Sequence, residues 1–150
     1  GILGSSDLDQ ASPLAASLQT DFLLPLIYPV VRDGKFKAKF LQKRLDKCAK
    51  ESGDYVKAFL KMFGDARPYV TMQSCKNQFY SDLITPLPDK IHVPGTEIHI
   101  FYALKMGKKY RARYQQHFAH PVLHEQNLQH EELLACHPGQ WAQLVKSIAL

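Results

Sequence analysis

The sequence of 150 residues lacks several features that mark special classes of protein. It has three cysteines, Cys48, Cys75 and Cys136, at wide spacing and without a Cys-x-x-Cys pair. This pattern argues against a disulfide framework and a structural zinc finger, so we expect thiols in a reducing compartment. We expect apolar runs shorter than the roughly 20 residues of a membrane span, and we expect no signal peptide at Gly1–Gly4. A cytoplasmic globular protein is therefore predicted.

What is present is an ordinary globular composition, with 45% hydrophobic and 22% charged residues. The 19 Lys and Arg exceed the 14 Asp and Glu, which gives a net charge of +5. A mildly basic balance is compatible with a nucleic-acid or acidic-membrane partner but does not require one.

The first 95 residues are predicted to be mainly helical. Gly1–Gly4 has the character of the end of a strand, and a polar loop follows it. Ser12-Pro13 is typical of a helix start. Pro25 and Pro29 are predicted to kink or break the apolar stretch that follows, which Asp33-Gly34 ends. Further helices are predicted at 35–50, 55–63 and 71–84. The first of these is basic, because seven of its sixteen residues are Lys or Arg.

The remaining residues change character and predict a strand–helix–strand–turn–helix order. Residues 96–102 alternate and are rich in β-formers, 105–118 are helical, and 121–125 form a second strand. A right-handed crossover would make the two strands parallel neighbours. Parallel strands need neighbours and cover on both faces, so we expect the edge of a larger sheet. An unpaired edge would then meet another chain or a second copy.

This order of elements resembles the C-terminal end of the α/β-hydrolase fold, most closely its lidded esterase- and lipase-like members. The resemblance rests on Gln129-His130-Glu131-Glu132 after the last strand, followed by Pro138 and Trp141 at a helix start. It implies an α/β fold, with His130 as the triad histidine. Residues 1–10 would be the end of a core strand with an acid-bearing loop, 11–95 a helical lid, and 96–150 the C-terminal part of the core.

The chain departs from that family in its nucleophile and its acid. The Gly-x-Ser-x-Gly elbow is absent, since Gly4-Ser5-Ser6-Asp7-Leu8 fits only its first half. No carboxylate follows the strand at 96–102. Asp7 and Asp9 follow the first strand and are the candidates for the acid. Asp7 is slightly favoured because it lies nearer the strand end, and Glu125 is a weaker choice.

The resemblance implies hydrolysis of a carboxylic ester or related acyl substrate. In a serine hydrolase, a neutral imidazole takes the serine proton and a carboxylate fixes the imidazole tautomer. This chain would supply His130 and Asp7 or Asp9, and an N-terminal half would supply the serine. Alone, the chain should not hydrolyse esters in this way. No metal or organic cofactor is implied.

The sequence also allows two other functions, a binding module and a metal site. A small basic helical module without catalysis would bind nucleic acid or acidic membrane in a salt-dependent manner. Its aromatic residues have helical spacing, which suits packing better than base stacking and makes nucleic acid the less favoured partner. A metal site at His117, His120 and His124 is conceivable. Pro121 divides that set between a helix and a strand, however, and no acidic residue sits at ligand spacing on the helix.

Overall fold

The computed structural model describes residues 1–149 and divides into two compact units. One unit, here called the sheet unit, contains Gly1–Leu8 and the chain from Leu87 onward. The other, the helical unit, contains Asp9–Pro86. The fold class is mixed α/β with a small parallel sheet, as predicted.

The sheet has three parallel strands in the order β1-β2-β3. They are β1 (Ile2–Leu3), β2 (His99–Ala103) and β3 (Val122–Gln126). Ile2 lies opposite His99, and Phe101 lies opposite His124. The predicted parallel pairing of the last two strands is confirmed. Because β2 is central, both of its edges are paired, whereas β1 and β3 each pair along one edge only within residues 1–149.

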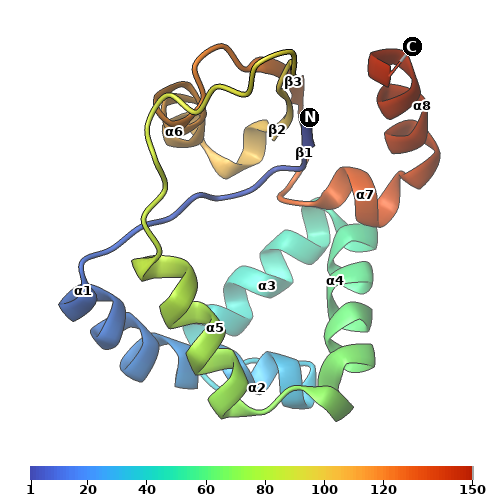
Figure 1. The fold of residues 1–150 in the computed structure, drawn as a ribbon. Helices are drawn as coiled ribbons and strands as arrows, with labels where there is room; N and C mark the ends of the chain where they lie inside the picture. The colour runs from blue at the N-terminus through green and yellow to red at the C-terminus, as the bar shows by residue number, and fades with distance from the viewer. Residues whose placement is uncertain (150) are drawn as a thin grey trace. The chain divides into compact units, whose positions relative to one another are not determined.

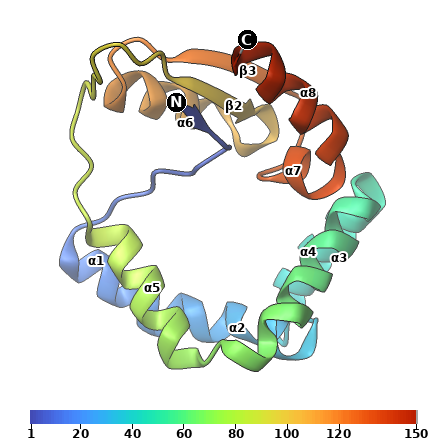
Figure 2. The same cartoon turned by 45° about the vertical axis from the view of Figure 1, so that its right-hand side comes forward.

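Helices lie on both faces of this sheet. Successive side chains of β2 point to opposite faces, so each face contributes packing contacts to a different helix. Ile100 and Tyr102 point to one face, where they pack with Tyr114 of α6 (Lys108–His117). Phe101 points to the other face, where its ring meets that of Trp141 edge-on at 4.8 Å. Trp141 belongs to α8 (Pro138–Ala149), and Figures 1 and 2 show α6 and α8 on opposite sides of the strands.

The helices of the sheet unit differ in two ways from the prediction. The expected helix at 105–118 is divided into a 3-10 turn (Leu104–Met106) and α6, because Gly107 between them has a φ of +108°. That backbone conformation suits glycine and interrupts a helix. A short helix that the sequence did not predict, α7 (Glu132–Cys136), precedes α8.

The helical unit consists of helices joined by short connections. Its elements are α1 (Pro13–Leu18), a π-helical turn (Gln19–Leu23), α2 (Leu24–Asp33), α3 (Lys39–Glu51), α4 (Gly53–Ala66), a 3-10 turn (Arg67–Tyr69) and α5 (Met72–Ile84). Helix α5 lies beside α1 and α2, while α4 contacts α2 and α3 (Figure 1).

The two prolines of the apolar stretch behave differently. Pro25 lies in the first turn of α2, directly after a π-helical turn that continues α1 without a gap. The helix is therefore locally distorted just before Pro25, but it is not broken there. Pro29 lies inside α2, so it does not break the helix either, and of the two expected outcomes, a kink or a break, the break is wrong. Gly34 ends α2 with a left-handed φ of +70°, as predicted.

The bounds of the next helices also shift. Helix α3 begins at Lys39 rather than Lys35. The backbone N–H of Phe36 donates instead to Oε1 of Gln42 at 2.9 Å. Helix α4 continues through Gly64 to Ala66, although Gly64 was predicted to end it. A capping box of Thr71 and Ser74 begins α5 close to its predicted start.

The helical stretch Pro13–Asp33 corrects one expectation about membranes. It has 21 residues and a mean hydropathy of 1.4, which is enough by length and composition to cross a bilayer. The expectation that every apolar run is shorter than this is therefore wrong. The core helix of a soluble protein and a signal sequence near an N-terminus satisfy the same criteria.

Candidate active site

The loops that carry the predicted catalytic residues of the sheet unit leave the same edge of the sheet. Because β1, β2 and β3 are parallel, their carboxyl ends share that edge. Asp7 lies in the loop after β1, and His130 lies in the turn after β3. In open parallel sheets, ligands bind at the carboxyl ends of the strands. The topology thus brings two predicted site residues to the edge where such chemistry is found.

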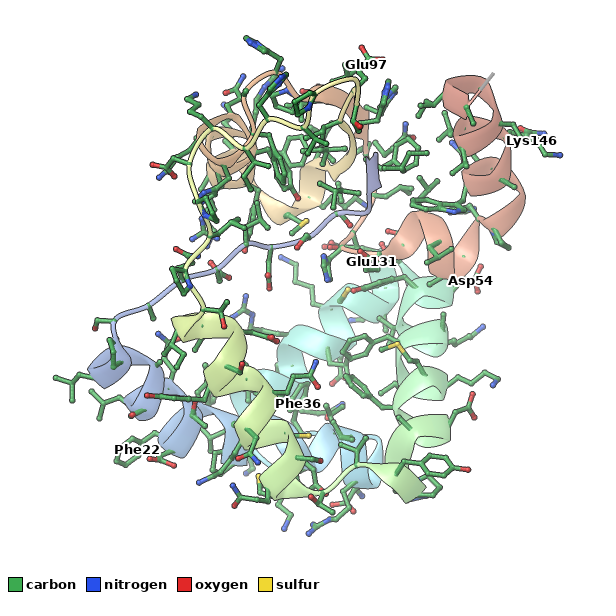
Figure 3. The ribbon with its side chains drawn as sticks, in the orientation of Figure 1. Phe22, Phe36, Asp54, Glu97, Glu131 and Lys146 are labelled. Carbon is green, nitrogen blue, oxygen red and sulfur yellow. The ribbon has the colours of Figure 1, made fainter. Side chains whose placement is uncertain are left out.

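A buried serine fastens the loop after β1 to the turn after β3. The side chain of Ser5 is 6% exposed, and its Oγ accepts a hydrogen bond from the backbone N–H of Glu131 at 2.9 Å. Figure 3 labels Glu131 close to the point where the chain leaves β1. The backbone next to His130 is therefore held against the end of the first strand.

The turn that carries His130 is also held by its own residues. The buried carboxylate of Glu132 accepts the backbone N–H of Gln129 at 2.6 Å. A hydrogen bond to a charged acceptor is stronger than one between neutral groups. Glu131 takes a left-handed φ of +57°, which is uncommon for a residue with a side chain. The backbone is thus constrained on both sides of His130, whose side chain is exposed.

Helix α6 holds the loop after β1 from the other side. The hydroxyl of Tyr114 donates to the carbonyl oxygen of Ser6, and Nη1 of Arg113 donates to the carbonyl oxygen of Asp7 at 3.0 Å. Burial raises the pKa of Tyr114 well above its usual value, and the negative charges of Asp7 and Glu131 add to this effect. The hydroxyl of Tyr114 is therefore neutral and acts as a hydrogen-bond donor to the loop after β1.

The predicted site residues are not all brought together. His130 and Asp7 are exposed side chains of the sheet unit, and within residues 1–149 no hydrogen bond or ion pair joins them. Asp9 belongs to the helical unit. Glu125 lies within β3, and its carboxylate forms an ion pair with Nη1 of Arg111 at 2.8 Å. Of the three carboxylates, Asp7 alone lies in a loop of the sheet unit at the carboxyl edge.

The cavity beside these loops is small. It has a volume of about 10 Å³, and Ser5, Leu128 and Glu131 are among its lining residues. A space of this size holds at most one water molecule. Neither His130 nor Asp7 lines this cavity.

The histidines considered for a metal site do not form one. Nδ1 of His117 lies 3.1 Å from Oδ1 of Asp89, and Nε2 of His124 lies 3.0 Å from Nδ1 of His99. His120 is exposed in the loop before β3. In the described part of the chain, no group of three or more His, Cys, Asp or Glu side chains could hold a metal ion.

Sequence reasoning did not find the residues that hold the loops in place. Ser5 and Glu131 are 126 positions apart, and Ser6 and Tyr114 are 108 positions apart. No local pattern signals such pairs, since each depends on the strand order. These two pairs could have been inferred only from the strand order, in which β1 pairs with β2 and β2 pairs with β3.

Comparisons with protein-family models, with curated proteins and with solved structures find no match to this chain.

Proposed function

We propose that this chain forms the lid and the C-terminal part of an α/β-hydrolase fold and contributes to the hydrolysis of a carboxylic ester or related acyl substrate. The observation that carries the proposal is the topology of the sheet unit. The helical unit is inserted between β1 and β2, α6 joins β2 to the parallel β3, and α8 follows the turn that bears His130. This is the order that the resemblance implies.

His130 is the proposed general base and Asp7 the carboxylate that orients it. In this role His130 takes the proton of a serine hydroxyl and later returns it to the leaving group. The constrained turn from Gln129 to Glu132 supports the proposal because a base must be held in one position. Asp9 remains the second candidate for the orienting carboxylate.

The serine is proposed to come from an N-terminal half that pairs with β1. Within the described residues, β1 forms hydrogen bonds with β2 on one edge only. The other edge carries backbone N–H and C=O groups that a further strand can pair with. A second copy of the chain pairing at this edge is the competing occupant, and it would double the mass in light scattering.

The experiment is hydrolysis of p-nitrophenyl butanoate by this chain joined to an upstream half that carries a nucleophile elbow. His130→Ala should lower kcat by about 10³-fold or more, as loss of a triad member does. His120→Ala, at an exposed histidine before β3, is the matched control and should leave kcat unchanged.

Two further variants assign the acid in the same assay. Asp7→Asn should lower kcat strongly and Asp9→Asn should not. The reverse result would move the orienting role to Asp9. Equal activity of the His130→Ala and His120→Ala proteins would contradict the proposed function.

A further inference from the structure

The helical unit contains a cavity that the proposed hydrolysis does not use. It lies between α3 and α4 and has a volume of about 260 Å³. Ligand pockets range from roughly 300 to 1,000 Å³, so this cavity lies just below the lower limit and suits a small ligand. Its apolar lining residues are Phe36, Leu41, Leu45, Tyr55, Val56 and Phe59.

Local contacts keep the walls of this cavity in place. Along α4, the ring of Phe59 lies 6.1 Å from that of Tyr55 and 4.4 Å, edge-on, from that of Phe63. Phe36 is fixed through its backbone N–H, which donates to the side chain of Gln42 on α3. Figure 3 shows Phe36 and Asp54 at opposite ends of the α3–α4 pair. These contacts hold the aromatic residues that line the cavity.

The apolar faces that line the cavity are poorly covered. Helix α3 has no buried residue, and in α4 only Val56 is buried. Phe40, at the start of α3, is 60% exposed. Apolar surface left in contact with water provides a driving force for binding an apolar molecule of matching size.

The charge of Arg44 favours an apolar molecule that carries an anionic group. Arg44 is the single charged residue that lines the cavity, and no acidic side chain lines it. In the part of the chain that the structure describes, no ion pair joins Arg44 to a carboxylate. The nearby Asp46 accepts a hydrogen bond from Gln42. A guanidinium binds a carboxylate with two parallel hydrogen bonds.

We infer that the α3–α4 cavity binds a medium-chain fatty acid, with the hydrocarbon chain between the helices and the carboxylate at Arg44. This inference goes beyond the proposed function, because it involves neither His130 nor Asp7 and needs no hydrolysis. Its failure would leave the proposed hydrolase role untouched, and the loss of that role would leave the fatty-acid site intact.

The test is calorimetric titration of the whole chain with decanoate below its micelle concentration. Saturable binding with one molecule per chain is expected. Arg44→Gln should weaken decanoate binding about fivefold, a modest loss because the arginine is exposed. It should leave the binding of decanol unchanged. Lys43→Gln is the matched control, since it removes the same charge from the neighbouring position, which does not line the cavity.

A second readout locates the bound chain. The thiol of Cys48 lines the cavity, so decanoate should slow its alkylation by iodoacetamide while alkylation of Cys136 continues at the same rate. Leu45→Trp should fill the cavity and weaken both decanoate and decanol. Circular dichroism checks that each variant is folded, and Arg44→Lys should restore part of the affinity.

The inference is overturned by any of three results. These are the absence of saturable decanoate binding, an equal effect of Arg44→Gln and Lys43→Gln, and binding without protection of Cys48. Association only with phosphatidylglycerol vesicles, and not with monomeric decanoate, would also overturn it and would indicate a membrane surface instead.

Discussion

The replacement Ser5→Ala tests how the turn carrying His130 is held against the first strand. Ser5 is buried, and its hydroxyl oxygen accepts the backbone N–H of Glu131 at 2.9 Å. Removing that acceptor costs the net value of one hydrogen bond, about 1 kcal/mol, and up to about 3 kcal/mol if the N–H remains buried and unpaired. We expect the free energy of unfolding to fall by about 1–2 kcal/mol in a urea titration. Hydrogen exchange at the Glu131 amide should accelerate correspondingly.

Ser6→Ala is the matched control for this replacement. Ser6 is the next residue, and its backbone carbonyl oxygen accepts from Tyr114, while within residues 1–149 its hydroxyl forms no hydrogen bond. The control should change the free energy of unfolding by less than about 0.5 kcal/mol. An equal loss in both variants, or unchanged exchange of the Glu131 amide in Ser5→Ala, would refute the reasoning.

Three further predictions concern other contacts. Tyr114→Phe removes the hydroxyl that donates to Ser6 and should lower the free energy of unfolding by about 1 kcal/mol in urea. Thr71→Ala removes the cap of α5 and should cost about 1 kcal/mol, whereas Thr71→Ser should retain most of it; equal losses would contradict the capping role. Burial, followed by the charge of His99, lowers the pKa of His124, while Glu97 acts in the opposite direction. The folded state therefore binds fewer protons, and the free energy of unfolding should fall as pH drops below about 6.5. His124→Gln should reduce this fall between pH 7.5 and 5, and His120→Gln should not.

Helix ends were predictable where the signal is local. Ser12 accepts the N–H of Ala15, and Pro13 occupies the first helical position, as their sequence indicates. Thr71 and Gly34 act in the same way at the ends of α5 and α2. Each of these signals acts within one turn of helix, so a single sequence contains all the information required.

Glycines inside helical patterns were harder to interpret. Gly64 was expected to end α4, but the helix continues, because a glycine costs only about 1 kcal/mol in a helix. Packing of Phe59 and Phe63 on the same helix offsets a cost of this size. Gly107 does interrupt a helix, since its φ of +108° lies outside the helical region. The sequence alone does not distinguish the two conformations.

Contacts between distant parts of the chain were predictable only where a general rule of strand connection applies. The parallel pairing of the last two strands follows from the strand–helix–strand crossover through α6, and it was predicted. The contact of Ser5 with Glu131 and the cavity between α3 and α4 were not predicted. Both depend on which side chains come together when the helices and strands pack. The spacing of residues along the chain does not predict those positions.

The central claim is that His130 activates a serine supplied by an N-terminal half. Its most direct test is the rate at which a fluorophosphonate labels that serine in the joined protein, followed by mass spectrometry. The account predicts rapid labelling in the parent and in His120→Ala, and a loss of about 10³-fold in His130→Ala. Labelling of the His130→Ala protein at the parental rate would contradict it.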